Sequence, residues 1–138
     1  MALNLLAIGT GKGLFLATST DDRRTWSING PHFPMTAVYA VGIDTRRDPV
    51  RLLAGVESSH FGPIVATSDD LGGSWHEPQQ RPIAFPEEAA LVRVWQIAPG
   101  AVNQPDVVYA GVEPQGLFRS TDGGVTFELV KGLWDHPH

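Results

Sequence analysis

The sequence has no cysteine, few charged residues and no long apolar run. Without cysteine the chain can form no disulfide, thiolate metal site or cysteine nucleophile. Charged residues make up 18% of the chain, below the roughly 25% of an average soluble domain, which argues against a disordered protein. No segment approaches the roughly 18 apolar residues of a membrane helix, and residues 1–9 lack the basic start of a signal peptide. We therefore expect a soluble, cytoplasmic protein with no membrane partner.

Basic residues are also scarce. The 10 lysines and arginines are outnumbered by 15 aspartates and glutamates, which gives a net charge of −5 and a pI near 5.4. Binding to a phosphate backbone depends on clustered positive charge and on counterion release. The charge balance therefore disfavours a nucleic-acid partner.

Glycine and proline, in contrast, are abundant, with 15 and 11 residues spread along the chain without a collagen-like period. The length of 138 residues and the 42% of apolar residues suit one globular domain with its own core. Many short elements joined by turns are expected.

The sequence repeats itself. Residues 19–26, 68–75 and 120–127 share the template Ser-x-Asp-x-Gly-x-Ser/Thr-aromatic, and they begin 49 and 52 positions apart. A second similarity aligns residues 38–57 with residues 94–113 without a gap. A period of about 50 residues that appears in two independent ways predicts a fold built from repeated units.

Each unit consists of short runs rich in Val, Ile, Leu and aromatic residues, bounded by Gly, Pro, Asn and Asp, which predicts an all-β protein. The expected strands are 4–9, 13–18 and 25–28 in the first unit, 37–43, 51–57, 63–68 and 74–77 in the second, and 92–98, 107–113, 116–120 and 126–130 in the third. A helix is conceivable only at 86–91, where a proline and two acidic residues suit a first turn.

The repeated eight-residue segment has the composition of a tight turn. Its aspartate can accept hydrogen bonds from turn amides, its glycine can adopt a positive φ, its serines or threonines can tie the ends, and its aromatic residue can pack inward. The residues expected in these structural roles are Ser19, Asp21, Trp26, Ser68, Asp70, Gly72, Trp75, Ser120, Asp122, Gly124 and Phe127. The first turn has Arg23 at the glycine position, so we expect it to be distorted or to use a right-handed conformation there.

At these turn residues the sequence resembles the Asp-box, or BNR-repeat, family of β-propellers, which includes sialidases and sortilin-like domains. The resemblance implies blades of four antiparallel strands, at approximately 1–30, 37–78 and 92–131, with the innermost strand missing from the first blade. It also implies that the turns lie on the face away from the ligand site.

The chain is short for a closed propeller. Propellers have typically four to eight blades, so at about 50 residues per blade even the smallest ring exceeds 138 residues. About three blades are therefore expected, as an open arc with exposed edges. We expect either part of a longer propeller or self-association, in which two copies meet head to tail and close a six-blade ring.

The functional face of such a propeller would be formed by the loops between blades and between the second and third strands. On these loops we expect a ligand-binding rim formed by His32, His60, Arg81, Glu87, Gln115 and His136. Glu57 and Glu113 recur in register at strand ends, and two carboxylates facing one channel could perform the acid and base chemistry of glycoside hydrolysis. The alternative is that the two glutamates recur only because repeated units also repeat their surface residues.

The resemblance to sialidases implies an arginine cluster and a tyrosine nucleophile. The Arg-Ile-Pro signature of the first blade is missing, and Tyr39 and Tyr109 lie inside expected strands, where packing is their expected role. No metal or cofactor is expected. Two functions stay open: a module that binds a glycan, a small ligand or a protein partner, and a sialidase-like hydrolase completed by blades that this chain lacks.

Overall fold

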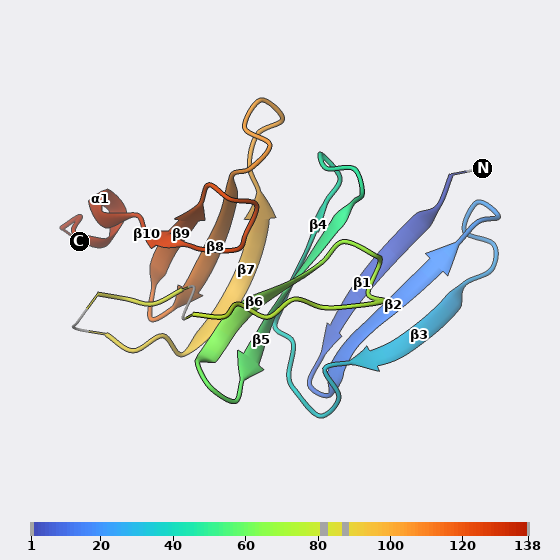
Figure 1. Ribbon diagram of the computed structural model, residues 1–138, viewed down its shortest axis with the longest axis horizontal. Coiled ribbons are helices and arrows are strands. Elements are labelled where there is room, and N and C mark those ends of the chain that lie inside the picture. Colours follow the sequence, from blue (N-terminus) through green and yellow to red (C-terminus); the bar gives the residue numbers. More distant parts are fainter. Residues whose placement is uncertain (1, 81–82, 87–88, 138) are drawn as a thin grey trace.

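The protein is nearly all β and consists of three antiparallel sheets, arranged side by side as propeller blades (Figure 1). The structure is a computed structural model that describes residues 2–80, 83–86 and 89–137. Within those ranges no helix is long and apolar enough to cross a membrane.

The sheets follow one another along the chain. The first contains β1 (Asn4–Thr10), β2 (Gly13–Ser19) and β3 (Ser27–His32); the second contains β4 (Ala40–Asp44), β5 (Arg51–Ser58) and β6 (Gly62–Ser68); the third contains β7 (Arg93–Pro99), β8 (Val108–Glu113), β9 (Gly116–Ser120) and β10 (Glu128–Leu129). Every pairing joins neighbours in sequence, so each sheet is a simple meander.

Two expected elements differ from the observed structure. The run 74–77 forms no strand and pairs only through an isolated bridge between His76 and Thr67, because Pro78 has no N–H with which to continue the ladder. The short helix lies at α1 (Lys131–Trp134). Of the run 86–91, the described residues 86 and 89–91 are not helical.

The three sheets share one register. At or next to its first residue, the second strand of each repeat unit (β1, β5 and β8) pairs with the serine of the following turn, in the pairs Asn4 with Ser19, Leu52 with Ser68 and Val108 with Ser120. This register defines equivalent residues in the sheets. It also shows that β1 is equivalent to β5 and β8, so the described first sheet contains no counterpart of the inner strands β4 and β7.

Each gap between neighbouring sheets holds one hydrophobic cluster. Between the first and second sheets, Leu14 and Leu16 meet Leu52, Val56 and Ile64. The second cluster lies between the second and third sheets and extends under the loop before β7. Its buried members are Ala40, Leu53, Val65, Ile83, Phe85, Val94, Ile97, Val108, Ala110, Val112, Phe118 and Phe127. The second sheet therefore buries both faces.

An ion pair joins the second and third sheets at the end opposite the hairpins β5–β6 and β8–β9. Asp44 is fully buried and accepts two hydrogen bonds from Arg46, from Nε and Nη2, each 2.8 Å long. Arg46 also donates to the carbonyl oxygens of Gln104 and Val107 in the next sheet's loop, at 2.8 and 2.9 Å. The Arg46 guanidinium holds the pKa of Asp44 below its usual value, although burial opposes the shift.

The repeated turn has the same hydrogen bonds in all three sheets. In the third turn, Ser120 Oγ donates to Asp122 Oδ1 at 2.6 Å and accepts from the Gly124 N–H at 2.9 Å. Thr126 closes the turn, because its N–H and its hydroxyl both donate to the Asp122 carboxylate, at 2.9 and 2.5 Å. The turns after β2 and β6 contain the corresponding bonds.

The expectation of a distorted or right-handed conformation at Arg23 is wrong. Arg23 has a φ of 67°, in the left-handed region, close to the 87° and 94° of Gly72 and Gly124. Its N–H donates to Ser19 Oγ at 3.0 Å, as the glycine amides do in the other turns. The hydrogen bonds to the Asp21 side chain and to Ser19 hold the turn in this conformation without glycine.

Glycine is required where a sheet packs against the turn. A Cβ on Gly72 would lie 2.6 Å from Leu16 Cδ1 of the first sheet, and one on Gly124 would lie 2.4 Å from Leu53 Cδ2 of the second. Each turn thus packs directly on the preceding sheet. Arg23 is exposed among the described residues, so its side chain meets no such sheet there.

We expect Gly124→Ala to lower the free energy of unfolding by about 1–3 kcal/mol, because the methyl group would collide with Leu53 at a backbone φ that disfavours any side chain. Gly11→Ala is the matched control, since a Cβ there would meet no atom within 4 Å. Urea denaturation of both variants measures the difference. Equal stabilities would contradict the close approach of turn and sheet.

Hydrogen bonding lowers the pKa values of the aspartates in the repeated turns. Donation from Thr25 and Ser19 lowers the pKa of Asp21 to about 2, and donation from Ser74 and Ser68 lowers the pKa of Asp70 to about 2. Burial raises the pKa of Asp122, but the hydrogen bonds outweigh it and the net shift is downward.

Lowering the pH should therefore destabilise the protein over a defined pH range. A carboxylate whose pKa is lower in the folded chain stabilises the fold above its unfolded pKa, and this contribution is lost as the pH falls through the folded pKa. For Asp21 and Asp70 the window runs from the ordinary value of 3.8 down to about 2. We expect urea denaturation to show stability falling steeply there. Asp70→Asn should show a shallower fall, and an unchanged slope would exclude the turns as its cause.

Candidate functional site

The end of the molecule opposite the repeated turns holds the candidate site. The hairpins β5–β6 and β8–β9 and the starts of β4 and β7 meet there, because β4 and β7 run antiparallel to β5 and β8. β4 and β7 also contact each other across the gap between sheets. Residues at the starts of these two strands are thereby brought together from two blades.

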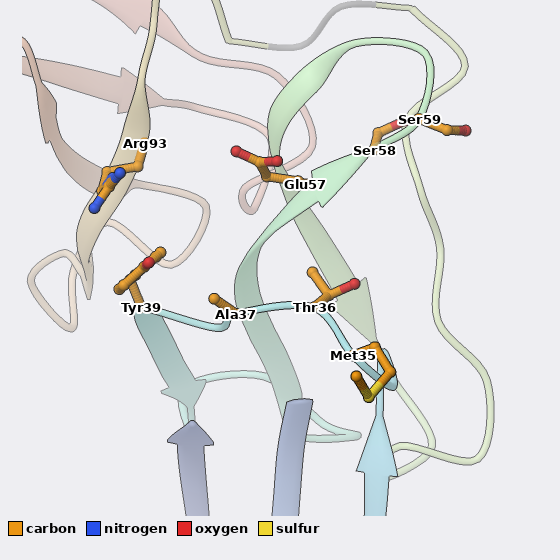
Figure 2. A pocket seen from close by; sticks show the side chains of 8 residues that line it. All are labelled: Met35, Thr36, Ala37, Tyr39, Glu57, Ser58, Ser59 and Arg93. Carbon is orange, nitrogen blue, oxygen red and sulfur yellow. The ribbon is translucent and has the colours of Figure 1, made fainter. Parts of the chain in front are cut away.

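A pocket of about 450 Å³ opens at this end, with Tyr39 and Arg93 at one side and Glu57 nearby (Figure 2). It is lined by Met35, Thr36, Ala37, Tyr39, Glu57, Ser58, Ser59 and Arg93. The lining thus combines hydroxyl groups, one carboxylate, one guanidinium and an aromatic ring. Its size suits a small ligand or a short segment of a larger one.

Arg93 is held by two aromatic rings. Its guanidinium carbon lies 4.7 Å from the centroid of the Tyr39 ring and 5.0 Å from the Trp95 ring, distances at which a cation is attracted to the ring electrons. The two rings contact each other edge to face, with centroids 5.2 Å apart. Both remain about half exposed, at 49% for Tyr39 and 45% for Trp95.

Glu113 completes the cluster. Its Oε2 accepts a hydrogen bond from Trp95 Nε1 at 3.1 Å and lies 3.5 Å from Arg93 Nε in an ion pair. The Arg93 Nε atom is buried and makes no hydrogen bond among the described residues. The carboxylate therefore orients the indole and the guanidinium beside the pocket, which Arg93 helps to line.

The two glutamates singled out in the sequence are both at this site, in different positions. Glu57 is exposed and lines the pocket, whereas Glu113 is engaged with Trp95 and Arg93. Their equivalence in the repeat thus does not extend to their surroundings.

The other described rim residues do not line this pocket. His60 and Gln115 are exposed on the β5–β6 and β8–β9 hairpins, and they line two other hollows. His136 follows α1 and its Nδ1 lies 2.8 Å from the Pro137 carbonyl oxygen. Arg81 and Glu87 lie outside the described residues. No group of three potential metal ligands occurs within the described ranges.

His32 sits between the first two sheets. Its Nδ1 accepts a hydrogen bond from Trp75 Nε1 at 3.3 Å, and its Nε2 lies 2.8 Å from Asn29 Oδ1. Trp75 also packs edge to face on Phe33, with centroids 4.9 Å apart. In this structure the histidine anchors the second turn to the first sheet.

Sequence reasoning missed the cluster that Arg93 forms with Tyr39, Trp95 and Glu113. Tyr39 was expected to pack inside a strand, but it precedes β4 and is exposed. The available signal was the alignment of residues 38–57 with 94–113, which pairs Tyr39 with Trp95. Arg93 aligns with Ala37, so it stands out only as a departure from the repeat.

Comparisons with known proteins identify the fold. No family model matches the sequence. No curated protein matches it either. Among solved structures, the chain is similar to the β-propeller in "YCF48 bound to D1 peptide", with a TM-score of 0.55 and 14% sequence identity. The match covers 91% of this chain and 42% of that one, so the chain spans less than half the length of its structural relative. This likeness establishes a β-propeller fold.

Proposed function

We propose that the chain is a ligand-binding β-propeller module, and that its ligand is a glycan bound in the pocket beside Tyr39, Glu57 and Arg93. The observation that carries the proposal is an exposed pair of aromatic rings holding a guanidinium at the edge of a hydroxyl-lined pocket. The hydrogen bonds of the three repeated turns support assignment to the Asp-box family, which includes glycan-processing proteins.

The chemistry of the lining suits a sugar. The apolar face of a sugar ring can stack on a half-exposed aromatic ring such as Tyr39. Sugar hydroxyls can donate to the Glu57 carboxylate and accept from the Arg93 guanidinium. The hydroxyl groups of Thr36 and Ser58 add further donors and acceptors around the same pocket.

The charge of the site favours a neutral ligand. Glu57 and Glu113 carry two negative charges against the single positive charge of Arg93, and the whole chain has a net charge of −5. A polyanion would therefore be repelled on approach. A neutral oligosaccharide meets no such barrier and uses both kinds of charged group as hydrogen-bond partners.

Calorimetric titration with a panel of neutral mono- and oligosaccharides tests the proposal. We expect at least one to bind, and Arg93→Ala and Tyr39→Ala to weaken it about tenfold or more, since each removes a contact to the ligand. Arg24→Ala is the matched control, because Arg24 is exposed in the first turn, at the opposite end of the molecule.

The same variants decide between ligand classes. A panel of short peptides, titrated in parallel, covers the other class of partner. If a peptide binds and no sugar does, and if Arg93→Ala weakens peptide binding, then the pocket is the binding site but its ligand is not a glycan. If Arg93→Ala weakens the binding of no ligand in either panel, then the pocket is not the binding site.

A second candidate, a sialidase-like glycoside hydrolase, is favoured by one observation. Tyr39, Glu57 and Arg93 line the same pocket, and the family resemblance implies a tyrosine nucleophile backed by a carboxylate together with arginines. Arg93 is the one arginine among the described residues that line this pocket, which makes binding without turnover our first proposal.

A fluorogenic sialoside separates the two candidates. We expect no release of the fluorophore above the uncatalysed rate. Turnover that Tyr39→Phe reduces by about a hundredfold or more, and that Tyr109→Phe leaves unchanged, would instead establish the hydrolase, because the first variant removes the nucleophilic oxygen.

A further inference from the structure

One hydrogen bond between the first two sheets can form only while a histidine is uncharged. The Nδ1 atom of His32 lies 3.3 Å from Nε1 of Trp75, and an indole N–H can donate but cannot accept. Nδ1 is therefore the unprotonated nitrogen, which accepts this bond. The other nitrogen, Nε2, then carries the hydrogen and donates to Asn29 Oδ1 at 2.8 Å. Both ring nitrogens thus have roles that fit one tautomer of the neutral ring.

Protonation of the ring would remove this bond. A protonated imidazole carries a hydrogen on both nitrogens, so the Nδ1–H of His32 would face the Nε1–H of Trp75 and neither group could accept. Histidine is the side chain whose charge ordinarily changes between about pH 5 and pH 8. A fall in pH across this range is therefore the change that would break the bond between His32 and Trp75.

Few other charged groups lie on the elements around His32. The sequence of β2 contains no ionisable side chain, and that of β3 contains His32 alone. The second turn has Asp69, which is held in an ion pair, and Asp70, whose pKa the hydrogen bonds of the turn lower to about 2. His76 follows that turn and Lys12 precedes β2, and both are exposed. Among the described residues, no carboxylate forms an ion pair with His32.

The same tryptophan supports the segment that lines the pocket. Trp75 packs edge to face on Phe33, with ring centroids 4.9 Å apart. Phe33 and Met35 have φ angles of 53° and 63°, in a left-handed region that non-glycine residues keep only where surrounding contacts hold them. Residues 35–37 run along the pocket directly after Phe33 (Figure 2). Release of Trp75 would therefore remove one of the contacts that hold this segment.

The bond between His32 and Trp75 is a departure from the repeat. The equivalent of Trp75 in the third turn is Phe127, whose ring has no N–H to donate. The third turn nevertheless packs on the second sheet and contributes Phe127 to the hydrophobic cluster there. The packing of a turn on a sheet therefore does not require this bond.

We propose that protonation of His32 releases Trp75 from the first sheet and rearranges the segment 33–37, which weakens ligand binding at the pocket. The effect on binding rests on the proposed function of the pocket. The release of Trp75 does not, because it follows from the hydrogen bonds of the His32 ring. The molecule is thus expected to bind its ligand more tightly in mildly alkaline than in mildly acidic solution.

NMR spectra of the ligand-free protein, recorded from about pH 8 to pH 5, test the release. The indole N–H signal of Trp75, identified by its loss in Trp75→Phe, should move with the same midpoint as the His32 ring protons. The amide signals of Met35 and Thr36 should follow. These shifts should vanish in His32→Asn, which keeps an acceptor but does not titrate, and persist in the matched control His76→Asn, because the His76 side chain is exposed. A Trp75 signal that stays in place over the whole range would overturn the release.

Calorimetric titration with the panel of neutral sugars, at both ends of this pH range, tests the effect on the pocket. We expect binding by the unmodified chain to weaken about threefold or more at the acidic end, which is the scale of one neutral hydrogen bond. His32→Asn should bind equally at both ends, and His76→Asn should weaken like the unmodified chain. Equal binding by the unmodified chain at both ends would overturn the link to the pocket. If no sugar binds at either end, the proposed function fails, and the amide signals of Met35 and Thr36 decide whether the segment rearranges.

Discussion

Burial on both faces is the constraint on which this structure depends. A twisted sheet of three or four strands has two apolar faces here, and one neighbouring sheet can cover only one of them. The second sheet has neighbours on both sides, and Ala54 and Ile64 on one face and Leu53 on the other are at most 1% exposed. The outer sheets satisfy the requirement on one face each. Packing between neighbouring sheets is therefore the repeated interaction that holds the three sheets together.

The repeated turn makes this stacking possible. Its aspartate uses hydrogen bonds to hold two consecutive left-handed residues, at φ 76° and 94° in the third turn. This compact shape brings the turn against the preceding sheet, where Gly124 leaves no room for a methyl group. Sequence alone could predict the turns and most strand positions, because both depend on local hydrogen bonding and on alternation of apolar residues. It could not predict that Arg23 keeps the left-handed conformation, because a non-glycine residue disfavours it and the hydrogen bonds to Ser19 and Asp21 outweigh that preference.

The binding pocket was less predictable, for a physical reason. Its residues come from the starts of β4 and β7 and from the end of β5, and only the packing of two sheets brings these together. A strand pattern places Tyr39 and Trp95 on inner strands but gives no measure of their exposure. The carboxylates Glu57 and Glu113 were found from their register, since repetition is visible in sequence. Their different environments follow from Arg93, which belongs to one unit alone.

Function in this repeat protein is therefore to be sought where the units differ. Identical residues in every unit, such as Ser19, Ser68 and Ser120, have the same contacts in every sheet and serve the fold. Arg93 stands where the preceding unit has an alanine, and it converts two equivalent aromatic rings into one asymmetric site. Arg23 stands where the other units have glycine, and it has the same left-handed backbone conformation. Arg93 therefore distinguishes one unit from the others at the pocket, whereas Arg23 keeps the backbone conformation that the turn has in every unit.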